Sequence, residues 1–88
     1  MKLKIQDIKV RNYLYWIGKE EEEFVSKVTS IDYEHGVLEE AWINCENLDN
    51  YSLRSLSSPH NWGKYKEIRY ANEEEIEFFE INMALKSL

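Results

Sequence analysis

The sequence predicts a small α+β protein, in which a strongly curved antiparallel sheet of four or five strands is closed by one C-terminal helix. The sheet is expected to be SH3-like or a partly open barrel. Short runs of β-branched and aromatic residues recur between residues 2 and 44 at the spacing of a β-meander. Residues 72–86 carry a helix cap followed by a helical period. Because 88 residues with 43% hydrophobic side chains suffice for one packed core, we expect a single domain over residues 1–88.

The strands of the first half are expected within residues 2–44. Leu3 and Ile5 alternate with lysines in a short extended segment, and residues 13–17 (YLYWI) form an apolar run typical of a buried strand. A second strand is predicted over residues 24–31 and a third over residues 37–44. The glutamates after Gly18 suit an exposed hairpin tip, and Gly36 suits a turn that needs positive φ.

Residues 45–63 differ in composition, because Asn, Ser, Gly and the only proline of the chain are concentrated there. We predict a long polar loop, anchored by leucines in about one helical turn. Loops of this length in a small domain are uncommon and are often functional. A final strand is predicted over residues 64–70, where apolar and charged residues alternate.

The C-terminal helix is predicted over residues 73–86. Asn72 and Glu75 have the spacing of a capping box, and Lys86 lies in the last turn, where the helix dipole favours a cation. At about 100° per residue the helix carries two opposite apolar stripes. One consists of Ile76, Phe79 and Met83, and the other of Phe78, Ile81, Leu85 and Leu88. Either the polar loop folds over the second stripe, or Phe78 and Leu85 meet a partner.

Charge is distributed unevenly along the chain. The formal net charge is −6, but residues 20–49 hold ten acidic side chains against one lysine, Lys27. The acidity argues against direct nucleic-acid binding, which depends on Lys and Arg. Such a segment can instead imitate a row of phosphates and occupy a basic groove. The expected ridge consists of Glu20, Glu21, Glu22, Glu23, Glu39 and Glu40. The simpler interpretation is that the first four only keep a hairpin soluble.

Trp62 lies between His60, Asn61 and Gly63 in the predicted loop. A tryptophan with few apolar neighbours in the sequence suits an interface anchor, because Trp and Tyr dominate binding hot spots. The alternative is a lid that packs onto the end of the barrel.

Residues that could carry chemistry are few. Cys45, His35 and His60 have no metal-ligand spacing, and no nucleotide-binding or hydrolase motif occurs. We therefore predict no catalytic residue, no cofactor and no metal. Neither a signal peptide nor an apolar run of about 18 residues is present, so we expect a cytoplasmic protein without a membrane partner.

Residues 5–15 (IQDIKVRNYLY) and 25–32 (VSKVTSID) resemble small SH3-like phage and prophage proteins of Bacteroidetes-type bacteria. Residues 69–76 and Phe79 are similar to the start of their closing helix. The chain departs from the pattern at Arg11, where glycine is usual, and at Asn72 and Glu73, where Thr and Pro are common. The resemblance implies a phage origin and an SH3-like fold. By analogy it implies an inhibitor of host defence, such as an anti-CRISPR protein.

The sequence thus predicts a non-enzymatic, phage-derived binding protein that acts in the bacterial host cell. It would occupy the basic RNA- or DNA-binding surface of a CRISPR effector or similar nuclease, with its acidic ridge and Trp62 or the helix. The alternative is a structural module that forms a homodimer through the C-terminal helix. A third interpretation is a small-ligand binder with a pocket lined by Trp16 and Trp42.

Overall fold

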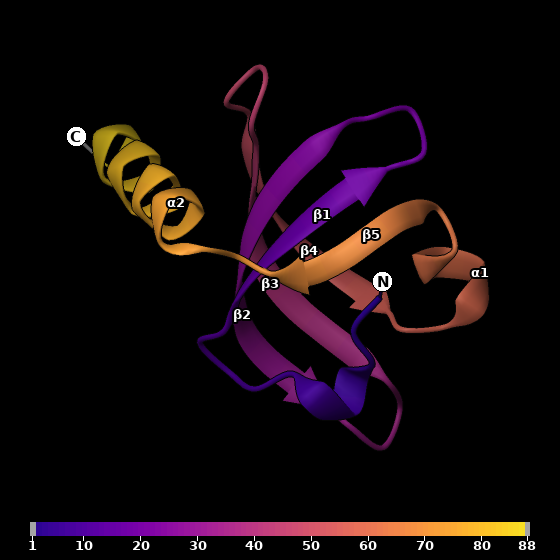
Figure 1. Cartoon of the computed structure of the whole chain (residues 1–88). Coiled ribbons are helices and arrows are strands. Elements are labelled where there is room, and N and C mark those ends of the chain that lie inside the picture. Colours follow the sequence, from indigo (N-terminus) through magenta and orange to yellow (C-terminus); the bar gives the residue numbers. More distant parts are fainter. Residues whose placement is uncertain (1, 88) are drawn as a thin grey trace.

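The computed structural model describes residues 2–87 and contains one sheet flanked by helices (Figure 1). The strands lie in the order β4-β3-β2-β1-β5, and every neighbouring pair is antiparallel. In chain order the elements are a 3₁₀ helix η1 (Ile5–Asp7), β1 (Tyr13–Gly18), β2 (Glu23–Asp32), β3 (Val37–Asn44), β4 (Asn50–Leu56), α1 (Pro59–Trp62), β5 (Tyr65–Tyr70) and α2 (Glu73–Lys86).

The predicted fold class is confirmed. The strands form one curved antiparallel sheet that does not close into a barrel, and a single helix follows it at the C-terminal end (Figure 1). The predicted helix limits, 73 and 86, are those of α2. Its capping box is formed as expected, because Asn72 Oδ1 accepts from the Glu75 amide and the Glu75 carboxylate accepts from the Asn72 amide.

The prediction of a polar loop over residues 45–63 is wrong, because this segment contains β4 and α1. The strand pairs with β3 along its whole length, from Asn50 opposite Ile43 to Leu56 opposite Val37. Tyr51 and Leu53 alternate with polar residues, which is the period of a strand. β4 lies at the edge of the sheet with most of its residues exposed, and for this reason its composition resembles that of a loop.

The N-terminal segment does not form the extended strand that the sequence predicts. Within residues 2–12 the structure has one isolated bridge, between Lys2 and Ile68, followed by η1. Ile5 and Ile8 are buried against the sheet, so the segment covers one end of the core instead of extending the sheet.

The two faces of the sheet carry two separate apolar clusters. Trp16, Trp42, Trp62, Leu38 and Ile68 are among the residues of the first, which lies on the face covered by η1 and α1. The second cluster lies on the opposite face under α2, which is seen on the other side of the sheet from α1 in Figure 1. Its buried residues are Tyr15, Val25, Ile43 and Phe79.

The two apolar stripes of α2 have different environments. Phe79 is buried, and Ile76 and Met83 of the same stripe are half-buried. In the second stripe Phe78 packs against the sheet, whereas Ile81 and Leu85 are 51% and 60% exposed. Leu88 lies outside the described residues. Within residues 45–63, Asn50 contacts Met83 of the first stripe and Cys45 lies beside Phe78, whereas Ile81 and Leu85 stay exposed.

Candidate functional site

The predicted acidic ridge is divided by the structure. Glu20, Glu21 and Glu22 form the turn between β1 and β2, and Glu23 begins β2, so these four lie together and are exposed. Glu39 is exposed but lies opposite Ser30, whereas the residue after Glu23 pairs with Asn44. Phe24 and Ser30 are six residues apart along β2, which corresponds to about 20 Å of strand. Glu39 is therefore not part of one surface with the hairpin.

The assignment of Glu40 to an exposed ridge is wrong. Its side chain is 1% exposed, because consecutive strand residues point to opposite faces and Glu39 takes the outer one. The carboxylate accepts hydrogen bonds from Ser26 Oγ at 3.2 Å, Trp42 Nε1 at 2.9 Å and Ser55 Oγ at 3.4 Å. Burial raises its pKa to about 7, against the lowering effect of these donors. Glu40 is therefore a core group that organises buried polar atoms.

Trp62 is 6% exposed, so its assignment as an exposed interface anchor is also wrong. Ser58 caps α1, Pro59 occupies its first turn, and this single turn holds the indole at 5.6 Å from the ring of Trp16, edge to face. The lid interpretation describes what Trp62 does. Its short helix could not be foreseen, because the surrounding residues are polar.

Three acidic segments lie towards one end of the sheet, in the β1–β2 hairpin, the β3–β4 turn and the first turn of α2. The backbone amide of Cys45 donates to the carbonyl of Glu23 at 2.9 Å, and this contact joins the β1–β2 hairpin to the turn between β3 and β4. Glu46 follows Cys45 in that turn, and Glu74 of α2 lines a cavity together with Cys45. We call Glu20, Glu21, Glu22, Glu23, Glu46 and Glu74 the acidic end. Lys66 forms an ion pair with Glu21 there.

An apolar cavity opens beside Glu74. Its volume is about 250 Å³, and its lining combines the apolar side chains of Tyr15, Val25 and Phe78 with Cys45 and the carboxylates of Glu74 and Glu75. Of the predicted partner-binding residues, Phe78 lines this cavity and Glu23 is connected to it through Tyr15. Glu20 and Glu22 line a different cavity, together with Lys64. Leu85 is exposed on another part of α2 and does not reach this cavity.

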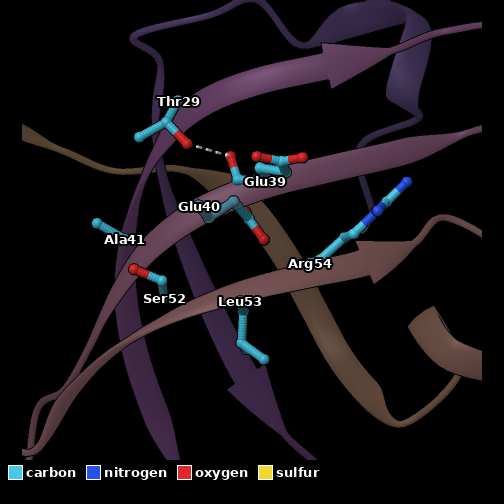
Figure 2. A pocket seen from close by; sticks show the side chains of 7 residues that line it. All are labelled: Thr29, Glu39, Glu40, Ala41, Ser52, Leu53 and Arg54. Atoms are coloured by element: carbon cyan, nitrogen blue, oxygen red, sulfur yellow. Dashed lines mark hydrogen bonds between the residues drawn. The ribbon is translucent and has the colours of Figure 1, made fainter.

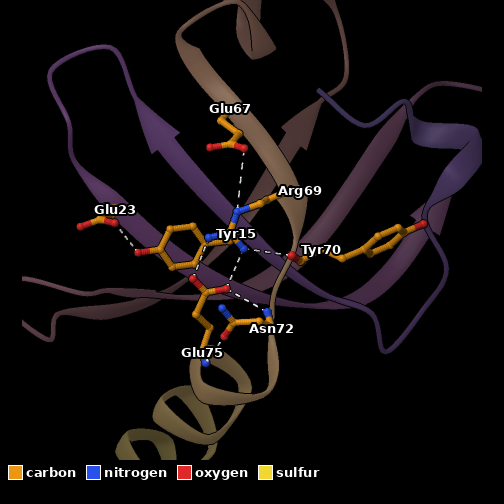
Figure 3. A network of polar contacts seen from close by, with 7 residues as sticks. All are labelled: Tyr15, Glu23, Glu67, Arg69, Tyr70, Asn72 and Glu75. Atoms are coloured by element: carbon orange, nitrogen blue, oxygen red, sulfur yellow. Dashed lines mark hydrogen bonds and ion pairs between the residues drawn. The ribbon is translucent and has the colours of Figure 1, made fainter. Parts of the chain in front are cut away.

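A polar network fixes the wall of this cavity (Figure 3). Arg69 of β5 donates two hydrogen bonds to Glu75, at 2.7 and 2.8 Å, and its guanidinium lies 4.4 Å from the centre of the Tyr15 ring. The hydroxyl of Tyr15 donates to Glu23 at 2.5 Å. Through these contacts β5 connects the hairpin of glutamates to the first turn of α2.

The network also sets the protonation of its members. Burial raises the pKa of Tyr15, and the hydrogen bond to Glu23 adds to this effect. Burial also tends to raise the pKa of Glu75, but hydrogen bonds from Arg69 and the Asn72 amide outweigh it and lower the pKa. Glu75 is therefore ionised at neutral pH, and its carboxylate oxygens accept the two hydrogen bonds from Arg69.

Cys45 has none of the features of a nucleophile. Burial raises the pKa of the Cys45 thiol, and the charges of Glu23 and Glu75 raise it further, so the reactive thiolate is disfavoured. His35 pairs with Asp32 at the opposite end of the molecule, at 2.8 Å. Among residues 2–87, no three His, Cys, Asp or Glu side chains come together in a way that could hold a metal ion.

A second groove follows the outer face of β2, β3 and β4 and was not expected from the sequence (Figure 2). It has a volume of about 390 Å³ and contains Glu39 and Arg54, with Thr29 Oγ1 donating to the Glu39 carbonyl at 3.0 Å. These residues alternate with core residues along the strands. Only the register of β4 places Arg54 opposite Glu39, so this groove could not be predicted from local sequence pattern.

No family model, curated protein or solved structure matches this chain. In the described part of the chain, no helix is long and apolar enough to cross a membrane.

Proposed function

We propose that this chain is a non-enzymatic binding protein that uses its acidic end to occupy a basic surface on a protein that handles nucleic acid. The observation that carries the proposal is an apolar cavity lined by Glu74 and Glu75 and joined to Glu23 through the Tyr15 hydroxyl. The exposed glutamates of the β1–β2 turn and Glu46 lie towards the same end of the sheet. Carboxylates steer a basic partner towards the surface, and the cavity adds apolar contact once the partner has arrived.

The composition of the acidic end supports a basic partner. Six carboxylates are present, and Lys66 pairs with one of them, Glu21. The cavity beside Glu74 is lined by Phe78, Val25 and Tyr15, against which the aliphatic part of a lysine or arginine side chain packs well. A partner that normally binds the phosphates of RNA or DNA presents such side chains in a row.

The resemblance to phage and prophage proteins suggests the class of partner. A CRISPR nuclease or a similar defence effector of a bacterial host has a basic channel for RNA and DNA, and an inhibitor of it would act in the host cytoplasm. The chain would compete with the nucleic acid and would not bind nucleic acid itself.

The test is inhibition of purified CRISPR nucleases by the full chain, measured as cleavage of a labelled target. The informative variant is the double substitution Glu20→Lys and Glu46→Lys, and its control is Glu34→Lys with Glu39→Lys. All four residues are exposed, and both variants change the formal net charge equally. We expect the first variant to lose inhibition and the control to retain it. Equal effects of the two variants would contradict a localised acidic site.

A second candidate function is self-association through α2, and the exposure of Ile81 and Leu85 favours it. These two side chains lie one turn apart on the helix, as expected for an apolar contact between two copies. Light scattering measures the mass in solution directly. A dimer that becomes a monomer in Leu85→Glu supports this candidate, and a monomer at all concentrations excludes it.

A further inference from the structure

A second cavity lies on the tryptophan face of the sheet, away from the acidic end. It has a volume of about 250 Å³ and is bordered by residues of β4, α1 and β5. Since β4 and β5 are the two edge strands, this cavity occupies the opening where the curved sheet does not close. We call it the seam cavity.

Four aromatic side chains line the seam cavity: Trp16, Trp42, Trp62 and Tyr65. The ring of Trp16 lies 4.7 Å from that of Trp42, 5.6 Å from that of Trp62 and 5.0 Å from that of Tyr65. Their mutual packing fixes the rings before any ligand arrives, which lowers the entropic cost of binding. A flat aromatic ligand gains from edge and face contacts with such a group.

The charged side chain on the tryptophan face of the seam cavity is cationic. Arg54 and Lys64 both belong to the lining, and no acidic residue does. Arg54 is paired with Glu39 in the register of β4 and shares the groove on the outer face with it, so Lys64 is the cation on the tryptophan side. Within residues 2–87 Lys64 has no carboxylate oxygen within 4.0 Å, which favours an anion beside it.

An unused hydrogen-bond donor adds to this preference. Trp16 Nε1 donates to Ser26 Oγ at 2.8 Å, and Trp42 Nε1 donates to Glu40. Trp62 Nε1 is buried and, within the described residues, has no acceptor. A buried donor without a partner costs stability, so an oxygen atom that reaches it from a ligand is favoured.

We propose that the seam cavity binds a small aromatic carboxylate, with its ring against the tryptophans and Tyr65 and its carboxylate towards Lys64. Glu40 lies beneath Trp42 and already accepts from Ser26, Trp42 and Ser55, so the negative charge of the ligand is placed at the rim and not at the floor. This proposal does not rest on the function proposed for the acidic end.

The test uses indole-3-acetate and tryptamine, which share one ring system and carry opposite charges. Each is titrated into the ¹⁵N-labelled full chain while the three indole N–H signals are followed by NMR. We expect indole-3-acetate to bind with a Kd on the order of 1 mM or tighter and to shift the Trp62 signal most. Tryptamine should bind about fivefold more weakly or worse.

Two variants and a control identify the site. Lys64→Ala should weaken indole-3-acetate binding roughly two- to fivefold, whereas Lys9→Ala, an exposed lysine outside the cavity lining, should not. Trp62→Phe keeps an aromatic ring and removes the N–H, so binding should weaken while the Trp16 and Trp42 signals stay in place. Absence of any indole shift at 10 mM ligand (about ten times the expected Kd) overturns the proposal. Equal binding of tryptamine, or equal effects of the two lysine variants, also overturns it.

Discussion

Glu40→Gln is the most informative substitution in the core. In the folded protein the pKa of Glu40 is about 7, compared with 4.5 for a solvated glutamate, because burial disfavours the charged form. The folded state therefore holds this proton more tightly than the unfolded state does. The stabilisation that comes from this tighter proton binding is complete at low pH and is lost as the pH rises from 4.5 through 7. Between pH 5 and pH 8 the loss from this group is about 2.5 kcal/mol.

The assay is urea unfolding of the wild type, Glu40→Gln and the control Glu39→Gln at pH 5 and pH 8. For a domain of this size, about 2.5 kcal/mol moves the urea midpoint by roughly 2 M. The wild type and Glu39→Gln should show this difference, whereas Glu40→Gln, which is neutral at both pH values, should not. Effects of pH elsewhere in the molecule are common to all three proteins and cancel in the comparison. The same pH dependence in Glu40→Gln and the wild type would refute the assignment.

Three further predictions concern α2 and the backbone. Phe79→Ala should reduce the free energy of unfolding by about 3–4 kcal/mol, because Phe79 is buried against the sheet. The control Leu85→Ala removes an exposed side chain and should change the free energy of unfolding by less than about 0.5 kcal/mol. Thermal unfolding measures both, and equal values would contradict the packing of α2. Arg69→Lys keeps the charge but loses the paired hydrogen bonds to Glu75. We expect about 1 kcal/mol of destabilisation and faster amide hydrogen exchange in the first turn of α2. Unchanged exchange in that turn would argue against the network. Arg11 has a φ of +77°, which is unfavourable for a residue with a side chain. Arg11→Gly should therefore stabilise the protein by up to about 1 kcal/mol in urea unfolding. A destabilised variant would contradict the expected backbone strain at Arg11.

The parts of the fold that depend on local pattern could be predicted from the sequence. The apolar run of residues 13–17, the β-branched residues of 24–31 and the capping box of Asn72 and Glu75 are local signals, because each depends on neighbours in the chain. β4 could not be recognised in the same way, because an edge strand has one covered side and its exposed Ser and Asn residues are those of a loop. Its pairing with β3 is a tertiary property.

The candidate site was predictable only in part. Exposed glutamates in the hairpin follow from composition, but the position of Glu23 beside Cys45 and of Glu74 beside Cys45 depends on the register of β2 and β3 and on the position of α2. Composition alone does not distinguish Glu39 from Glu40, because the two glutamates are adjacent in the sequence. The alternation of β3 places them on opposite faces, and the donors that make burial of Glu40 tolerable come from β2, β3 and β4.

The pairing of β1 with both β2 and β5 has a consequence for the order of folding. The strands β1 to β4 form successive hairpins, whose contacts are close in the sequence, whereas Leu14 of β1 meets Tyr70 only after nearly the whole chain has been made. Closing that long loop is the slower step, because its entropic cost comes before its contacts form. On the ribosome, the glutamate hairpin therefore forms while α2 is still unsynthesised. The cavity around Phe78 is completed last, so a nascent chain carries the charge of the site before it has its apolar contact.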